Sequence, residues 1–383
     1  MALTGRRDGP PLGPPGLLVA RLDGLRTDLT ALAGLELDPA ALLGERAAIA
    51  GLHRSGEVSC GGTTRLLPSA DGWVALSLTR PDDIDAVPAL VEAVSVADPW
   101  DAVTACAATR PGASFVERAR LLGLPVAALP PPGVTRPDPV VRRRVDGPPA
   151  PPRRLCGMRV VDLSSLWAGP LCGSLLAAAG ADVVKVESTR RPDGARHGPQ
   201  RFFDLMNAGK RSVALDLTTS EGTGILARLL GAADVVIEAS RPRALRQLGL
   251  DAERLTSTGP QVWVSITGHG RAEPDAGWVG FGDDAAVAGG LVACDGAGPI
   301  FCADAVADPL AGLVAARAAL RALATGGRWA VDVALSRVAA WAAGPTAPVP
   351  VSVSAAPPRA RPEERPGPAL GEHTAAVLAS LPR

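Results

Sequence analysis

The chain has 383 residues, six cysteines and equal numbers, 39 each, of acidic and basic side chains. This length predicts a large core and two domains, whereas the zero net charge without a basic stripe argues against nucleic acid as a partner. The cysteine spacings fit no zinc site and no apolar run is long enough to span a bilayer, so we expect a metal-free, cytoplasmic protein with reduced thiols and no membrane contact.

The amino-terminal part predicts a helical segment followed by a small α+β domain. Residues 1–54 begin as a Gly/Pro-rich loop and continue with two helical patterns, at 19–34 and 39–52. Residues 55–130 contain apolar runs on both sides of Ala70-Asp71-Gly72, a turn signal that predicts a β-hairpin. Further helical patterns lie at 82–94, 99–108 and 113–122.

Residues 155–344 carry the pattern of a parallel α/β sheet with helices between its strands. An apolar run at Val160–Leu163, a small-residue turn, an Ala/Leu-rich helix and a second apolar run ending in Glu187 form one strand–helix–strand unit. Parallel strands are predicted at 158–163, 182–187, 234–238 and 262–266. A Pro/Arg-rich linker, 131–154, precedes this domain, and a Pro-rich tail with a terminal helix, 345–383, follows it.

The turn Ala168-Gly169-Pro170 follows the first of these strands. In open α/β sheets ligands bind at the carboxyl ends of the strands, and a following helix offers free N–H groups to a phosphate. Lys210 and Arg211 add two cations beside another strand. Position, helix dipole and charge together predict a phosphate-bearing cofactor.

An ordered series of motifs is more specific than this strand pattern. The motifs read GMRVVDLSSLWAGP from Gly157, GADVVKVE from Gly180, NAGKRSVALDL from Asn207, ADVVIEASRP from Ala233 and AVADPLAG from Ala305. The series, which covers about residues 155–340, resembles the family III CoA-transferases, the CaiB/BaiF group that includes formyl-CoA transferase. The resemblance implies a Rossmann-like parallel-sheet domain that binds CoA, a smaller α+β domain and a homodimer whose chains interlock.

The resemblance also implies a reaction, the movement of CoA from an acyl-CoA thioester to a carboxylic acid through a covalent aspartyl intermediate. Asp308 occupies the position of the family's catalytic aspartate. A carboxylate suits this role because it can form an anhydride and then a thioester. Pro309 and the helical pattern after it place Asp308 at a helix start, where an N-cap is the alternative role. Asp304, Asp283 and Asp284 are weaker candidates.

CoA-binding residues follow from the resemblance by position. They are Ser165, Leu166, Trp167, Ala168, Glu187, Ser188, Lys210, Arg211, Ala239, Ser240 and Arg246. Ser165 and Trp167 differ from the residues that are usual in the family loop after the first strand. Ala239 and Ser240 replace the usual Asn and aromatic residue, which alters the expected adenine pocket.

The order of the parts departs from the family. Signatures of the small domain, at Asp71–Leu76 and Gly123–Leu129, stand before the CoA-binding half instead of after it. The terminal signature GEHTAAVL, at 371–378, keeps its usual last place. The chain therefore resembles the back half of one family member followed by the front half of another.

Three alternatives compete with CoA transfer. A CoA-binding homologue that is non-catalytic or depends on a partner would fit the altered loop and the rearranged order. An acyl-CoA racemase or isomerase uses a paired His and Asp, but residues 279–290 contain no His, and His269 lies in a different turn. A nicotinamide-dependent oxidoreductase is disfavoured because SSLWAGP lacks the glycine spacing for a pyrophosphate.

Overall fold

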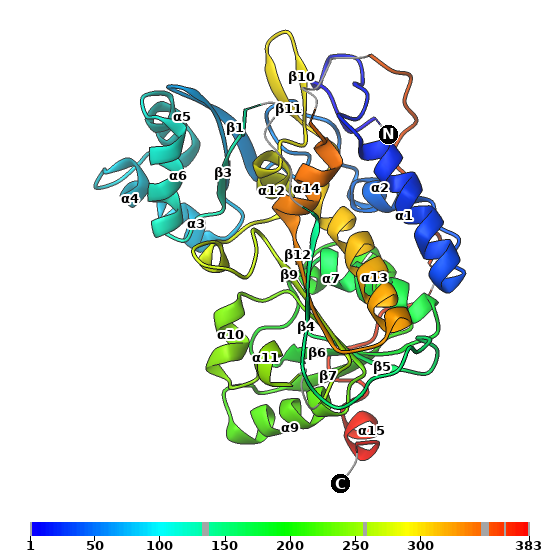
Figure 1. The fold of residues 1–383 in the computed structure, drawn as a ribbon. Coiled ribbons are helices and arrows are strands. Elements are labelled where there is room, and N and C mark those ends of the chain that lie inside the picture. The colour runs from blue at the N-terminus through cyan, green and yellow to red at the C-terminus, as the bar shows by residue number, and fades with distance from the viewer. Residues whose placement is uncertain (1, 132–137, 256–258, 346–351, 364, 382–383) are drawn as a thin grey trace.

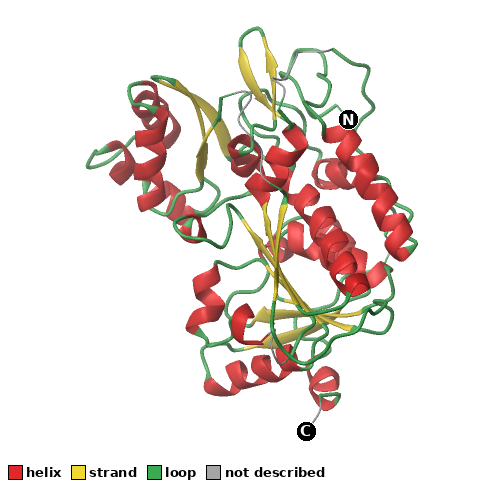
Figure 2. Cartoon of the chain, in the orientation of Figure 1, coloured by secondary structure: helices red, strands yellow, loops and turns green. Residues whose placement is uncertain are grey.

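A computed structural model describes residues 2–131, 138–255, 259–345, 352–363 and 365–381. Figure 1 shows a twisted central sheet with helices on both faces and a smaller three-stranded domain beside one end. Figure 2 shows the strands between the two helical layers. In the described ranges, no helix combines the length and the apolar character that a membrane crossing requires.

The central sheet has seven strands. Their order is β4 (Val140–Arg144), β12 (Trp329–Ala334), β9 (Val262–Thr267), β8 (Val235–Glu238), β5 (Arg159–Asp162), β6 (Asp182–Ser188) and β7 (Arg211–Leu215). Six strands run parallel, and β4 pairs antiparallel with β12 at one edge. The four strands predicted from the apolar runs are all present and parallel. The chain order reverses between β5 and β8, which is the kind of switch point where ligands bind in such sheets.

One face of the sheet is covered by helices from distant parts of the chain. They are α1 (Leu18–Ala33), α2 (Pro39–Ala50), α7 (Ala168–Ala178), α8 (Gln200–Asn207), α13 (Ala307–Thr325) and α14 (Leu335–Ala343). Leu22, Leu25 and Leu29 recur at the spacing of one helix face and are buried in a core shared with α13. The amino-terminal segment is therefore part of the large core.

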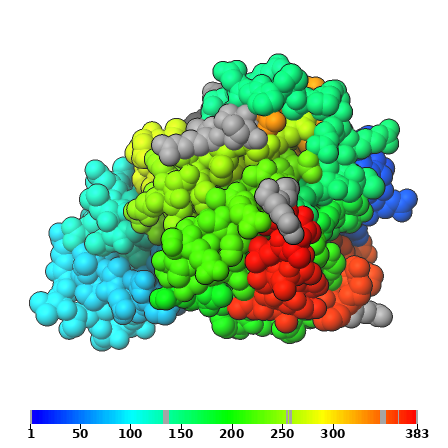
Figure 3. Space-filling view, turned by 90° about the horizontal axis from the view of Figure 1, so that it is seen from below, coloured from blue at the N-terminus to red at the C-terminus, as the bar shows by residue number. Residues whose placement is uncertain are grey.

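The opposite face is covered by a second set of helices. They are α9 (Ser220–Gly231), α10 (Pro242–Gln247), α11 (Ala252–Leu255) and α15 (Thr374–Ala379). Leu226 and Leu229 of α9 pack in a core with Val236 and Trp263 of the sheet. The carboxyl-terminal segment returns to β7, where His373 donates a backbone hydrogen bond to Ser212. Figure 3 shows this segment against the part of the surface built from the middle of the chain.

The small domain contains an antiparallel sheet and four short helices. Its elements are β1 (Thr64–Ser69), β2 (Gly72–Ser77), β3 (Val126–Ala128), α3 (Pro81–Asp85), α4 (Val87–Val91), α5 (Pro99–Ala108) and α6 (Gly112–Leu121). Ser69 pairs with Gly72, so the predicted hairpin turns at Ala70-Asp71. The Asp71 carboxylate accepts a hydrogen bond from the Gly112 N–H, which fastens the turn to α6.

Three further elements connect the two domains. The helix α12 (Gly282–Ala288) packs against β2 and β3, and it is followed by the hairpin of β10 (Val292–Asp295) and β11 (Gly298–Phe301). Two short 3₁₀ helices, η1 (Gly194–His197) and η2 (Asp275–Gly277), lie in loops of the large domain.

The segment 131–154, predicted as a solvated linker, contributes β4 to the central sheet. Pro139 and Pro148 flank the strand but none of its five residues is proline. Its backbone N–H groups are therefore free to pair with β12, and composition alone did not reveal this.

Candidate active site

Asp308 lies in the first turn of α13 and is half-buried. Its backbone N–H donates to the Ala305 carbonyl oxygen at 2.9 Å. Its carboxyl group faces the backbone N–H of Gly282, the first residue of α12. A Cβ at position 282 would stand 2.6 Å from Asp308 Oδ2 and 2.3 Å from the Ala305 oxygen. The loop before α12 can approach Asp308 this closely only because position 282 is glycine.

Two more carboxyl groups lie beside Asp308. Asp283 is 8% exposed and its Oδ1 accepts the Ala305 N–H at 2.9 Å, whereas Asp304 is fully buried. Burial, followed by the negative charge of Asp304, raises the pKa of Asp283 to about 7. Burial also raises the pKa of Asp308 to about 7, although the positive charge of Arg46 opposes this rise. A carboxyl group with this pKa is partly ionised near neutral pH, which suits acid, base or nucleophilic chemistry.

The turn that leads into α13 has an unusual backbone. Ala303 and Ala305 have φ values of 56° and 43°, a left-handed conformation that alanine rarely adopts. The Ala303 N–H donates to Thr4 Oγ1 at 3.0 Å, so the amino-terminal segment helps to hold the turn. Such strained residues cluster at functional sites, where the surrounding structure enforces them.

The predicted CoA loop follows β5 at the carboxyl edge of the sheet. Ser165 is exposed and Leu166 is 44% exposed, whereas Trp167 and Ala168 are buried. Leu166 has a φ of 70°, and its N–H donates to Asp193 Oδ1 at 2.9 Å. The backbone and the Ser165 and Leu166 side chains of this loop are therefore available to a ligand, and the other two residues belong to the core.

Helix α13 and helix α7 are in close contact, which brings this loop near Asp308. A Cβ at Gly312, one turn after Asp308, would stand 2.7 Å from the Ala168 carbonyl oxygen. The structure therefore brings the predicted nucleophile and the predicted CoA loop to one end of the sheet.

Two buried lysines donate hydrogen bonds to backbone carbonyl oxygens at the two ends of the CoA loop. Lys185 donates to the Ser164 carbonyl oxygen at 2.9 Å and to Asp193 Oδ2 at 2.8 Å. Lys210 donates to Asp162 Oδ2 and to the Pro170 carbonyl oxygen, each at 2.9 Å. Lys210 is only 3% exposed, so this placement supports a structural role and not the phosphate contact predicted for it.

Other predicted contacts have partners inside the protein. Both Glu187 oxygens accept hydrogen bonds from the Arg196 guanidinium, at 2.9 and 2.6 Å. Ser188, at the end of the same strand, accepts the Arg190 N–H through its hydroxyl oxygen. Arg211 begins β7 and pairs with Asp182 at the amino edge of the sheet. The structure does not bring Arg211 to the carboxyl edge where the loop lies.

The segment after β8 carries a cluster of arginines at the carboxyl edge. Ala239 and Arg246 are exposed, and the Ser240 hydroxyl donates to Glu238 Oε2 at 3.0 Å. Beside them, partial burial and three neighbouring guanidinium groups lower the pKa of Arg241. The neighbouring residues are Arg243, Arg80 and Arg191.

We call these four residues the arginine cluster: Arg80, Arg191, Arg241 and Arg243. Only Arg241 lies in a motif of the sequence, and the other three were not predicted. Like charges gathered at a sheet edge favour an anion. Arg80, however, is already paired with the buried Asp83 carboxylate through its Nε and Nη2, and its guanidinium carbon lies 5.9 Å from the centroid of the Phe281 ring, next to Gly282. Arg241 and Arg243 thus follow β8 at the switch point of the sheet, and Arg80 lies beside Phe281, the residue before Gly282.

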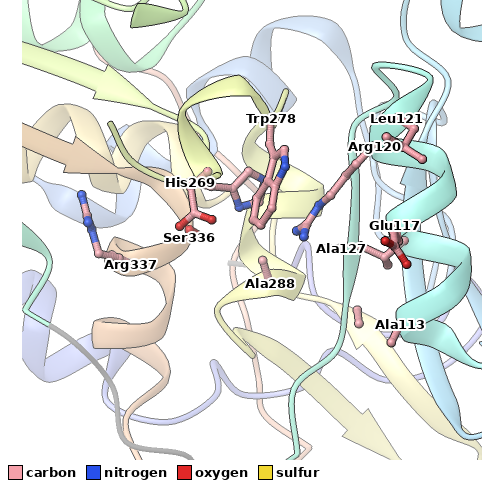
Figure 4. A pocket seen from close by; sticks show the side chains of 13 residues that line it. Ala113, Glu117, Arg120, Leu121, Ala127, His269, Trp278, Ala288, Ser336 and Arg337 are labelled. Carbon is pink, nitrogen blue, oxygen red and sulfur yellow. The ribbon is translucent and has the colours of Figure 1, made fainter. Parts of the chain in front are cut away.

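A pocket of about 740 Å³ lies between the small domain and the large domain. Figure 4 shows Arg120 reaching from α6 toward Trp278, with His269 on the other side of that ring. The guanidinium carbon lies 3.5 Å from the ring centroid, and the His269 ring contacts Trp278 edge to face at 5.8 Å. Burial, followed by the charge of Arg120, lowers the pKa of His269 to about 4. His269 is therefore a neutral side chain that lines the pocket between the two domains.

Comparisons with known proteins agree with the motifs. A family model described as CoA-transferase family III matches residues 155–374. The chain is 35% identical over 184 residues to a succinyl-CoA–D-citramalate CoA-transferase of Chloroflexus aurantiacus, which is 45% of this chain and 46% of that relative. It is 39% identical over 141 residues to a succinate–glutarate CoA-transferase of Agrobacterium fabrum, 33% of this chain and 35% of that relative.

A solved structure of a CaiB/BaiF family protein from Brucella suis is 34% identical, with a TM-score of 0.44. The alignment covers 49% of this chain and 54% of that one. The chain thus spans about half the length, or less, of the relatives that it matches.

Proposed function

The chain belongs to CoA-transferase family III, and from this membership we propose that it moves CoA from an acyl-CoA thioester to a carboxylic acid, with Asp308 as the nucleophile. One observation supports this assignment above the others. A partly ionised carboxyl group stands at the start of α13, faced by a backbone N–H and joined to the CoA loop by the contact of Gly312 with Ala168. A helix start favours a negative charge and a developing oxyanion.

The proposed reaction begins when the Asp308 carboxylate attacks the thioester carbonyl of the donor. The C–S bond breaks, CoA leaves as the thiolate, and a mixed anhydride remains on Asp308. The thiolate then attacks the aspartyl carbonyl, which releases the donor acid as a carboxylate and leaves an aspartyl-CoA thioester. The acceptor carboxylate repeats these two steps in reverse and leaves as the new acyl-CoA. Asp308 is regenerated, and no proton is consumed.

The protein supplies binding, orientation and charge for this reaction. Arg191, Arg241 and Arg243 of the arginine cluster are suited to the phosphates of CoA, because planar guanidinium groups pair with phosphate oxygens through two hydrogen bonds. Phe281 and the exposed Leu166 offer apolar surface for the pantetheine arm between the cluster and Asp308. The Gly282 N–H points at the Asp308 carboxyl group in this structure. During the reaction it would stabilise the carbonyl oxygen of the aspartyl thioester.

A transfer assay tests the proposal. The chain is incubated with one acyl-CoA from a panel and an isotopically labelled carboxylic acid, and labelled acyl-CoA is measured by mass spectrometry. We expect transfer with the native chain and none with Asp308→Asn, which preserves size and capping ability but is not a nucleophile. Binding of CoA without transfer, by a folded chain, would favour the non-catalytic, partner-dependent homologue instead.

The racemase alternative has one feature in its favour. A Cβ at Gly280 would stand 3.0 Å from His269 Nε2 and 3.4 Å from Asp284 Oδ2, and both atoms are buried without a hydrogen-bond partner in the described residues. A buried His and a buried Asp thus both lie next to Gly280. Exchange of the α-proton of an acyl-CoA in deuterated water, lost in His269→Gln and kept in Asp308→Asn, would favour this alternative.

Two further properties belong to the proposal and not to the observed fold. By resemblance we propose an interlocked homodimer and action in the cytoplasm. Sedimentation of the purified chain would test the first, since a single species at the monomer mass would contradict it.

A further inference from the structure

Arg46 reaches the surroundings of Asp308 from a distant part of the sequence. It lies on α2, in the amino-terminal segment that carries no motif of the CoA-binding domain. Its Nε donates to Asp304 Oδ2 at 2.9 Å and its Nη2 donates to Oδ1 at 2.5 Å. This is a two-point ion pair to a fully buried carboxylate, which fixes the direction of the guanidinium group.

Two other contacts place the same guanidinium group between the catalytic turn and the CoA loop. Its central carbon lies 5.6 Å from the centroid of the Trp167 ring, so one side of the group faces the loop. Cys60, whose thiol contacts the Ala303 carbonyl oxygen at 3.4 Å, lies beside the same pair. Arg46 therefore contacts both Asp304, in the turn that leads to Asp308, and Trp167 of the CoA loop.

The charges around Asp308 come from three elements. Arg46 approaches from α2, Asp283 from the start of α12, and Asp304 from the turn before α13. The two acids oppose ionisation of Asp308, and Arg46 is the charged group that acts on it most strongly. The Gly282 N–H acts in the same direction as Arg46. Arg46 thus favours the ionised form of Asp308, whereas Asp283 and Asp304 disfavour it. Asp308 must be ionised to attack the thioester.

We propose that Arg46 is a positioning residue for Asp308: Asp304 holds its guanidinium group in place, and its charge maintains the carboxylate form of Asp308 beside two other acids. This inference rests on the proposed function, because an ionised Asp308 matters only if it is the nucleophile. It also gives the amino-terminal segment a part in the chemistry. The segment completes the electrostatic surroundings of the site within one chain.

A direct measurement is the pH dependence of carbodiimide labelling at Asp308, followed by peptide mass spectrometry. Carbodiimide adds to protonated carboxyl groups, so labelling falls as Asp308 ionises, with an expected midpoint near pH 7 in the native chain. Loss of a neighbouring cation raises the pKa of a carboxyl group, so Arg46→Gln should move the midpoint upward by about one to three pH units. Arg46→Lys keeps the charge and should keep the midpoint close to that of the native chain.

A matched control is Arg317→Gln. Arg317 also joins the amino-terminal segment to α13, through Asp28, but it lies outside the surroundings of Asp308. In Arg317→Gln, the midpoint of Asp308 labelling should equal that of the native chain. If Arg46→Gln does not fold, Arg46→Gln/Asp304→Asn keeps a neutral hydrogen-bonding pair and should show a smaller upward shift, because one anion is lost as well.

An unchanged midpoint in a folded Arg46→Gln chain, or in the double variant, would overturn the inference. Equal upward shifts in Arg46→Lys and Arg46→Gln would also overturn it, because the effect would then come from shape and not from charge. Labelling requires no turnover, so a native chain without transfer activity would contradict the proposed function and leave this measurement valid.

Discussion

Gly282 and Asp308 come from different helices and lie so close that a Cβ on the glycine would stand 2.6 Å from Asp308 Oδ2. No other residue type fits there without a shift of the backbone or of the carboxyl group. We therefore expect Gly282→Ala to displace Asp308 and to lower the rate of CoA transfer about 100-fold, since a displacement of about 1 Å has an effect of this size.

The control for this variant is Gly296→Ala. A Cβ at position 296 meets no atom within 4 Å, and the residue needs no left-handed conformation. Transfer at the native rate in Gly296→Ala and a reduced rate in Gly282→Ala would support the placement. A Gly282→Ala chain with native activity would show that the close approach has no role in the reaction.

The contact between α13 and α7 should be visible in stability. Gly312→Ala places a methyl group 2.7 Å from the Ala168 carbonyl oxygen, and overpacking of this kind lowers the free energy of unfolding by about 1–3 kcal/mol. Gly224→Ala, in α9, meets open space and should raise the free energy of unfolding by about 0.5–1 kcal/mol through helix propensity. Denaturant titrations that give both changes the same sign would contradict the packing described.

Asp283 should shift the pH dependence of CoA transfer in the direction opposite to the shift caused by Arg46. Its negative charge raises the pKa of Asp308, so Asp283→Asn should lower the pH at which transfer reaches half of its maximum. The pKa of Asp283 is itself raised in the folded state, to about 7. The penalty for its burial is therefore absent below the unfolded value near 4, grows as pH rises from about 4 to about 7, and is complete above about 7. We expect Asp283→Asn to be more stable than the native chain at pH 8 and no more stable at pH 4.

From the proposed function we expect the arginine cluster to bind the phosphates of CoA. Each hydrogen-bonded pair with a charged group contributes about 1.5–3 kcal/mol, so Arg241→Ala should weaken CoA binding roughly 10- to 100-fold in calorimetry. The loss should shrink with rising salt, because exposed charges are screened. Arg211→Ala is the informative comparison. The sequence predicted a phosphate contact for Arg211, but its position at the opposite edge of the sheet predicts unchanged affinity.

Much of the fold could be predicted because its signals are local. The apolar runs that become β5, β6, β8 and β9 are continuous, and Asp308 lies in a short motif next to a proline. The motifs also located the loop of Ser165 and Leu166. These features depend on neighbours in sequence, which a single chain displays directly.

The features of the site that could not be predicted depend on residues that are far apart in sequence. Arg46 and Asp304 are separated by 258 positions, and no local pattern links them. Lys210 has the charge that a phosphate site needs, but its ammonium group is committed to Asp162 inside the protein. Only the three-dimensional packing decides whether a cation faces a ligand or a buried carboxylate.

The most direct test of the account is intact-mass analysis of the chain quenched during transfer, followed by peptide mapping. We predict a covalent adduct, either the acyl group or CoA, on the peptide that contains Asp308, and no adduct in Asp308→Asn. A chain that transfers CoA while its adduct lies on another residue, or that keeps full transfer as Asp308→Asn, would contradict the assignment of the nucleophile.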